Sequence, residues 1–276
     1  MIFINSLTRT LIKSRVTILF GFSFGVSALF SGLTNATETD YWNTSNEANS
    51  SQISHHIWQN ILDSYLIDND DSGINLFKYA SVSDSDKQSL NKYIGELQTL
   101  DPRQINKAQQ KAYWINLYNA LTVKLILNNY PVKSITKLGD SVFSFGPWDD
   151  DAANISGETL SLNDIEHKIL RPIFKDQRIH YAVNCASFSC PNLSGTAYTA
   201  ENMEGLLSQG ACDYINHTRG VTFQGEDLLL SSIYEWYIED FGGDNQSVVK
   251  HLLSCAQPKL KRKLIVFQKS NADVDH

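Results

Sequence analysis

The segment between Arg178 and Pro191, with the sequence RIHYAVNCASFSCP, holds the densest group of reactive side chains in the chain. A cysteine becomes a nucleophile when a neighbouring histidine favours its thiolate form. The β-favouring residues at the start of this segment predict a short strand, with Cys185 where the strand gives way to a loop. Alternate residues of a strand face opposite sides, so His180, five positions before Cys185, would point away from it.

His167 is therefore the better predicted partner for Cys185. It lies in a short helix that the sequence predicts to begin at Ser161, with Asp164 completing a capping box, and to end before Pro172. A paired cysteine and histidine would carry out acyl transfer, meaning hydrolysis or exchange of an amide. The residues assigned to this hypothetical site are Cys185, His167, His180, Asn184, Glu166 and Asn116.

Other interpretations of the same residues stay open. A Cys185–Cys190 disulfide would remove the nucleophile, and the five-residue separation is not that of thioredoxin-type redox sites. The residue types of a zinc site are present without its ligand spacing, so we predict no metal and no cofactor. In a non-catalytic binding domain, the histidines, Arg171 and Asn184 would form a buried polar network. The aromatic loop Phe143–Trp148 would then contact a small molecule or a peptide in a cleft.

The amino-terminal 36 residues have the layout of a secretory signal peptide. Three basic residues precede an apolar run, Val16–Phe30, and small or short residues lead to a cleavage point after Ala36. The run is shorter than the roughly 20 residues that a spanning helix needs, so we predict cleavage and no membrane span afterwards. The predicted location is the periplasm or the extracellular space, where the four cysteines would meet oxidising conditions.

Charge excludes some partners. Removal of the three basic residues in the predicted signal peptide lowers the formal net charge from −7 to −10. A surface this acidic has no electrostatic basis for binding nucleic acid and is expected to be repelled by anionic lipid. The charge does not indicate an oligomeric state.

The remaining patterns predict a helix-rich α+β domain. The longest helical pattern, from Asn106 to Asn129, is apolar on nearly every side, which places it in the middle of a domain. Asn116 and Asn119 lie on one face of it, and they either satisfy backbone groups or line the site. We predict a small, mainly antiparallel sheet on this helix. The predicted organisation is a flexible spacer over residues 37–56, one globular domain over 57–269 and a polar tail over 270–276, with a final strand at Leu264–Phe267.

Four ordered motifs resemble one protein family. They are KAYWINLYNALT (111–122), LSLNDIEHKILRP (160–172), the central segment 178–191 and DFG (240–242), and the resemblance covers about residues 57–245. The family is domain of unknown function 547, whose bacterial members resemble this chain in being exported. Its plant members carry the domain behind a coiled-coil region that this chain lacks, and they often lack the second cysteine of the central motif. The resemblance therefore favours a role for Cys185 over one for Cys190, and it implies no known reaction.

Overall fold

The computed structural model describes residues 10–12, 39–68, 70–132, 135, 138 and 146–272. Its long helices are α2 (His56–Tyr65), α3 (Asp84–Thr99), α4 (Lys107–Asn129), α6 (Met203–Asn216), α8 (Asn245–Cys255) and α9 (Pro258–Ala272). Most of the signal-peptide prediction and residues 142–145 of the predicted aromatic loop lie outside the described residues, as do residues 273–276 of the predicted tail.

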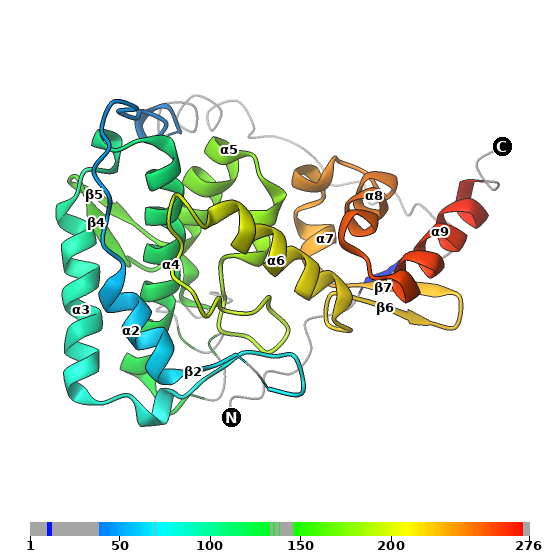
Figure 1. Ribbon diagram of the computed structural model, residues 1–276, viewed down its shortest axis with the longest axis horizontal. Coiled ribbons are helices and arrows are strands. Elements are labelled where there is room, and N and C mark those ends of the chain that lie inside the picture. The colour runs from blue at the N-terminus through cyan, green and yellow to red at the C-terminus, as the bar shows by residue number, and fades with distance from the viewer. Residues whose placement is uncertain are drawn as a thin grey trace, which may run out of the picture.

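Helix α4 is the centre of the larger hydrophobic core (Figure 1). It begins one residue after the predicted start, because Asn106 is its cap: the Asn106 side chain accepts a hydrogen bond from the Gln109 amide. Tyr113, Trp114, Ile115 and their neighbours are almost completely buried, and α4 packs against α3 and the helical segment Asp164–Leu170. The predicted central helix and the helix-rich α+β class are confirmed.

The strands form short antiparallel sheets instead of one sheet. They pair as β2 (Leu66–Ile67) with β3 (Leu76–Phe77), β4 (Ala153–Ile155) with β5 (Glu158–Leu160), and β6 (Val221–Gln224) with β7 (Asp227–Leu230). β1 (Thr10–Ile12) adds to the free edge of β7. Cleavage after Ala36 would remove β1 and leave the β6–β7 hairpin. The β4–β5 hairpin contributes Ala153, Ile155 and Leu160 to the core around α4.

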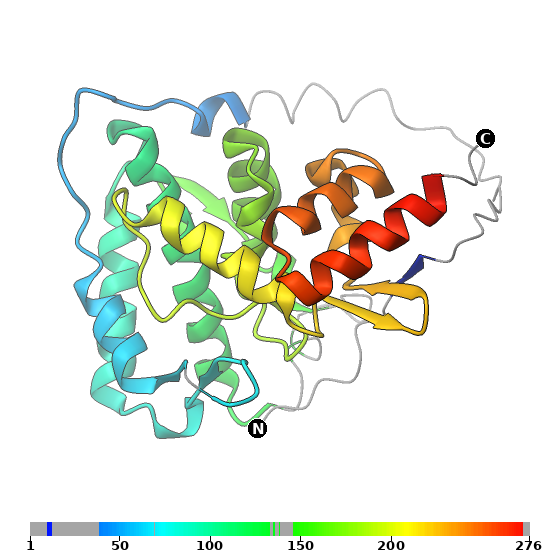
Figure 2. The same cartoon turned by 45° about the vertical axis from the view of Figure 1, so that its right-hand side comes forward.

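A second hydrophobic cluster lies beside the first. It is formed by the end of α6, the β6–β7 hairpin, α7 (Ile233–Trp236), α8 and α9 (Figure 2). A disulfide between Cys212 of α6 and Cys255 of α8 ties two of these helices together. The predicted strand at Leu264–Phe267 is wrong, because these residues belong to α9 and only Leu264 is fully buried. Four consecutive apolar residues fit a strand and a helix equally well.

The segment expected to be a spacer packs against the core over residues 39–54. Trp42 is 4% exposed, and its ring meets the ring of Trp114 edge to face at 5.2 Å. The side chains of Gln110 and Asn106 donate hydrogen bonds to the backbone of Thr44 and Asn49. A single buried tryptophan thus holds a polar segment that composition alone describes as flexible.

Among the described helices, none has the length and apolar character needed to cross a membrane.

Candidate functional site

The start of the central segment is a 3₁₀ helix, Gln177–Tyr181, and the predicted strand is wrong. The carboxylate of Asp176 accepts hydrogen bonds from the Arg178 amide and guanidinium, and Lys111 of α4 forms an ion pair with it at 2.7 Å. This capped turn overrides the β preference of Ile179 and Tyr181. Because this part of the segment is not a strand, the alternation of strand faces does not determine how His180 and Cys185 are placed relative to each other.

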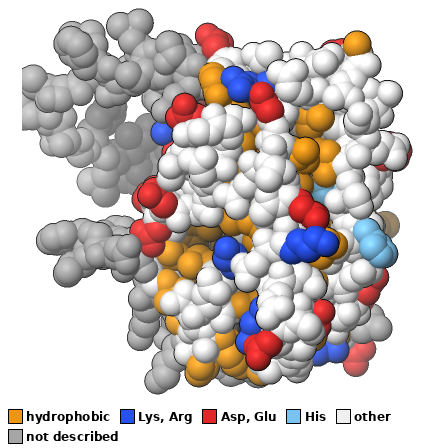
Figure 3. Space-filling view, turned by 90° about the vertical axis from the view of Figure 1, so that its left-hand side faces the viewer, with side chains coloured by type: hydrophobic (Ala, Val, Ile, Leu, Met, Phe, Trp, Pro, Cys, Tyr) orange, Lys and Arg blue, Asp and Glu red, His pale blue; other side chains and the backbone are white. Residues whose placement is uncertain are grey.

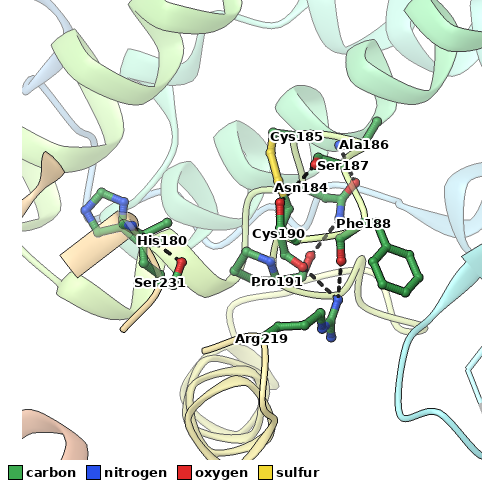
Figure 4. The surroundings of a disulfide bond; sticks show 12 residues. His180, Asn184, Cys185, Ala186, Ser187, Phe188, Cys190, Pro191, Arg219 and Ser231 are labelled. Atoms are coloured by element: carbon green, nitrogen blue, oxygen red, sulfur yellow. Dashed lines mark hydrogen bonds between the residues drawn. A yellow bond between two sulfur atoms is a disulfide. The ribbon is translucent and has the colours of Figure 1, made fainter. Parts of the chain in front are cut away.

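Cys185 is bonded to Cys190 (Figure 4). Polar contacts reinforce the loop that this disulfide closes. Asn184 donates to the carbonyl of Pro191 at 2.7 Å, and Arg219 donates to the carbonyl of Cys190 at 2.9 Å. The predicted free thiol at Cys185 is thus contradicted, because a cysteine in a disulfide is not a nucleophile.

Two asparagines of α4 hold the chain on either side of this loop. The amide of Asn116 donates to the carbonyl of Tyr198 at 2.7 Å and accepts from its N–H at 3.0 Å. Asn119 also makes two hydrogen bonds to the backbone. Its amide donates to the carbonyl of Ala182 at 2.9 Å, and its side-chain oxygen accepts from the N–H of Asn184 at 2.9 Å. Both asparagine side chains are buried. They satisfy backbone groups, which is the structural alternative stated above.

A second group of polar side chains surrounds His180, which we call the His180 cluster: Glu166, His167, Arg171, His180, Tyr237 and Asp240. Glu166 and His167 come from a π-helical segment, Asp164–Leu170, and Arg171 begins the short helix α5, Arg171–Phe174. The predicted capping box starts this segment, since Ser161 and Asp164 exchange side-chain to backbone hydrogen bonds. The helical path continues through Pro172 to Phe174, beyond the predicted end.

The imidazole of His180 is enclosed on three sides. Its Nε2 lies 2.6 Å from Oδ2 of Asp240, its Nδ1 lies 3.7 Å from Oε1 of Glu166, and its ring stacks on Tyr237 at 4.2 Å. Its side chain is 2% exposed. Asp240 belongs to a second 3₁₀ helix, Ile238–Phe241, and also accepts a hydrogen bond from Nε of Arg171 at 2.5 Å. Three of the four sequence motifs therefore converge on one carboxylate.

The two histidines of the cluster have opposite electrostatics. Burial disfavours a charged His180, but the hydrogen bonds that its ring donates to Asp240 and Glu166 outweigh this effect and raise the pKa of His180. Burial lowers the pKa of His167, and the cations Arg171 and His180 lower it further against the opposing charge of Glu166. The two carboxylates thus favour the imidazolium form of His180, whereas His167 is neutral at pH 7.

The tautomer of the neutral His167 follows from its neighbour. Nη1 of Arg171 lies 3.1 Å from Nδ1 of His167, and a guanidinium can only donate. Nδ1 therefore accepts, and the ring proton is on Nε2. The side chain of His167 is 32% exposed, so this N–H donor is within reach of a ligand.

Beside the cluster, the surface is hollowed over a volume of about 460 Å³. The hollow is lined by His167, Arg171 and Lys175 on one side and by Glu239 and Asp240 on the other. Asp176 also lines it, with its carboxylate held by Lys111 and Arg178. In the part of the chain that the structure describes, no group of three or more His, Cys, Asp or Glu side chains is arranged to hold a metal ion.

The six predicted site residues thus divide into two groups. Glu166, His167 and His180 meet in the His180 cluster, whereas Asn184 and Cys185 belong to the disulfide loop and Asn116 binds the backbone of Tyr198 beyond it. In Figure 4 the imidazole of His180 lies apart from the disulfide. Within the described ranges, His167 contacts members of its own cluster and makes no hydrogen bond to Cys185.

Asp240 was not among the predicted site residues, although its DFG motif was one of the four that carried the resemblance. The two glycines after Phe241 are the signal that could have drawn attention to it. Gly242 adopts a φ of 107°, in the region that favours glycine, so the chain turns sharply just after the carboxylate. A tight turn of this kind indicates a residue whose position is fixed.

Searches of curated proteins and of solved structures found no match. Residues 102–215 match the family described as "Protein of unknown function, DUF547". The match is shorter than the resemblance drawn from the motifs and does not include Asp240. The family it matches is the one suspected from the sequence.

Proposed function

We propose that this protein is an exported, non-catalytic binding domain. In this proposal its cysteine and histidine motifs build the frame, and the hollow beside His167 and Arg171 binds the carboxylate of a small molecule or peptide. The family match gives no reaction. The proposal rests on the contacts of the described residues.

One observation carries the non-catalytic part: the residues best suited to catalysis are already engaged. Cys185 is joined to Cys190, and His180 is buried with both ring nitrogens facing carboxylates. An acyl-transfer enzyme needs its nucleophile and its base to reach a substrate together. Cys185 is held in the disulfide, and the partly exposed His167 makes no hydrogen bond to it, so the cysteine-dependent mechanism lacks its nucleophile.

The donors around the hollow indicate the ligand. Arg171 uses Nε for Asp240 and Nη1 for His167, and its guanidinium lies over the ring of Tyr237 at 4.6 Å, but Nη2 makes no hydrogen bond among the described residues. Nη2, the Nε2–H of His167 and the ammonium group of Lys175 are the donors that a carboxylate requires. Glu239 on the opposite wall disfavours ligands with several negative charges. A single carboxylate therefore fits better than a polyphosphate.

Export is supported by two features. The amino-terminal segment has the layout of a signal peptide, and the four cysteines form two disulfides, Cys185–Cys190 and Cys212–Cys255. Disulfides persist mainly in oxidising compartments.

Calorimetric titration with a panel of amino acids, short peptides and their amidated counterparts tests the ligand class. We expect a carboxylate to bind, its amide to bind at least tenfold more weakly, and His167→Gln with Lys175→Gln to lose a similar factor. Lys250→Gln is the matched control, since this exposed lysine of α8 is not among the residues lining the hollow. Equal binding of acids and amides, or equal losses in test and control variants, would contradict the proposed site.

The non-catalytic part is tested separately. Amide hydrolysis or exchange by the oxidised protein, lost in Cys185→Ser, would overturn it and revive acyl transfer.

A further inference from the structure

Helix α9 carries an unusual concentration of positive charge for an acidic protein. The whole chain has a formal net charge of −7, yet this helix contains no acidic residue. Its cations are Lys259, Lys261, Arg262, Lys263 and Lys269, and all five are exposed. The helix lies at the edge of the second hydrophobic cluster, away from α4 (Figures 1 and 2). A local field of this kind acts independently of the net charge at distances near the Debye length, about 8–10 Å.

The cations surround an apolar outer face. The inner side of α9 packs on the second cluster through Leu264, which is fully buried, with Leu260 and Phe267 beside it. At 100° per residue, Ile265 and Val266 point to the opposite side. They are 38% and 64% exposed. This outer face therefore mixes cations with exposed branched aliphatic side chains.

The far side of the molecule has a different charge pattern. There, cations and carboxylates are interspersed, as on α3 where Lys87 pairs with Asp84 and Lys92 with Glu96 (Figure 3). None of the α9 cations forms an ion pair within the described residues; Lys263 lies over the ring of Phe223 at 5.2 Å. Paired charges are typical of a solvated face, whereas unpaired cations of one sign attract an anionic surface.

We propose that α9 docks this domain on an anionic lipid bilayer. The cations would lie among the phosphate groups, and Ile265 and Val266 would enter the boundary between headgroups and acyl chains, as in interfacial amphipathic helices. An acidic polypeptide bound to α9 would form ion pairs with the cations but would leave Ile265 and Val266 exposed to water. The combination of both residue types favours the bilayer.

Co-sedimentation of the full chain with vesicles tests the proposal, using phosphatidylcholine with and without phosphatidylglycerol. Arg262→Gln with Lys269→Gln removes two outer cations, and Val266→Ser removes the most exposed aliphatic side chain of the helix. Lys87→Gln with Lys92→Gln on α3 is the matched control. Every variant carries the same amino-terminal segment, so any contribution of that segment to binding cancels in the comparison.

We expect binding that requires phosphatidylglycerol and weakens as salt is added. The double α9 variant should bind about 10- to 30-fold more weakly, Val266→Ser several-fold more weakly, and the α3 control unchanged. The proposal is overturned if the α3 and α9 variants lose the same amount, or if wild type binds both vesicle types equally. Loss of binding to polyglutamate in the α9 variants, with vesicle binding intact, would overturn it in favour of an acidic polypeptide. None of these outcomes depends on the carboxylate hollow.

Discussion

Replacement of Asp240 by asparagine removes a carboxylate that serves two cations at once. Its Oδ2 accepts a hydrogen bond from Nε of Arg171 at 2.5 Å and lies 2.6 Å from Nε2 of the buried His180. Each hydrogen bond between charged groups contributes about 1.5–3 kcal/mol, and breaking a buried ion pair by removing one partner costs about 3–5 kcal/mol. Because the Asp240 side chain is 25% exposed, we expect a loss near the lower end, about 3 kcal/mol at pH 7.

Urea unfolding with both disulfides intact measures this loss as a shift in midpoint at constant slope. Glu239→Gln is the control, because Glu239 is the exposed neighbour of Asp240 on the same 3₁₀ helix. A decrease in the free energy of unfolding below about 1 kcal/mol for Asp240→Asn, or one equal to that of the control, would show that the contacts of Asp240 with Arg171 and His180 do not stabilise the fold. Surface charge changes of this kind cost at most about 0.5 kcal/mol.

The pH dependence gives an independent check. The raised pKa of His180 stabilises the fold fully below the unfolded pKa of about 6.5, and this contribution is lost as the pH rises through the folded pKa. The lowered pKa of His167 has the opposite effect on the fold. Its contribution to stability is present above the unfolded pKa of about 6.5 and is lost as the pH falls below that value. The readout is therefore the difference between wild type and Asp240→Asn. This difference should shrink as the pH rises through the folded pKa of His180, and a constant difference would show that His180 is not charged.

The remaining predictions concern the core, the cysteines and export. Ile115→Ala should lower the free energy of unfolding by about 2–5 kcal/mol in the same urea assay, because Ile115 is fully buried in the middle of α4; a loss under 1 kcal/mol would contradict its place in the core. Iodoacetamide followed by peptide mapping should label Cys185 only after reduction and find it joined to Cys190; labelling without reductant would show a free thiol. Protein recovered from the cell envelope should begin at or near Thr37, whereas an intact amino-terminal segment in the membrane fraction would show an anchor.

The parts of the fold that the sequence predicts are those with one dominant physical cause. Helix α4 could be located from its continuous apolar pattern between Asn106 and Asn129. The strand expected after Arg178 fails because the deciding contact, from Asp176 to Lys111, joins residues 65 positions apart. Local propensity cannot register such a contact.

The candidate site was predictable only as separate pieces. Glu166, His167 and His180 were selected by residue type, and the structure does place them together. Their common partner, Asp240, lies 60 positions after His180, and no periodic pattern connects the two. Cys185 was chosen for its reactivity, yet its bond to Cys190 depends on how the loop folds, which is why sequence alone left the disulfide as one alternative among several.

The Cys212–Cys255 disulfide has a consequence for the reduced protein. It closes a loop 43 residues long in sequence separation, and Asp240 lies inside that loop. Closing a loop of this length removes roughly 4 kcal/mol of chain entropy from the unfolded state. A reduced chain lacks this contribution, so the segment between the two cysteines, which carries Asp240 to His180, would be held less firmly in the reduced protein than in the oxidised one.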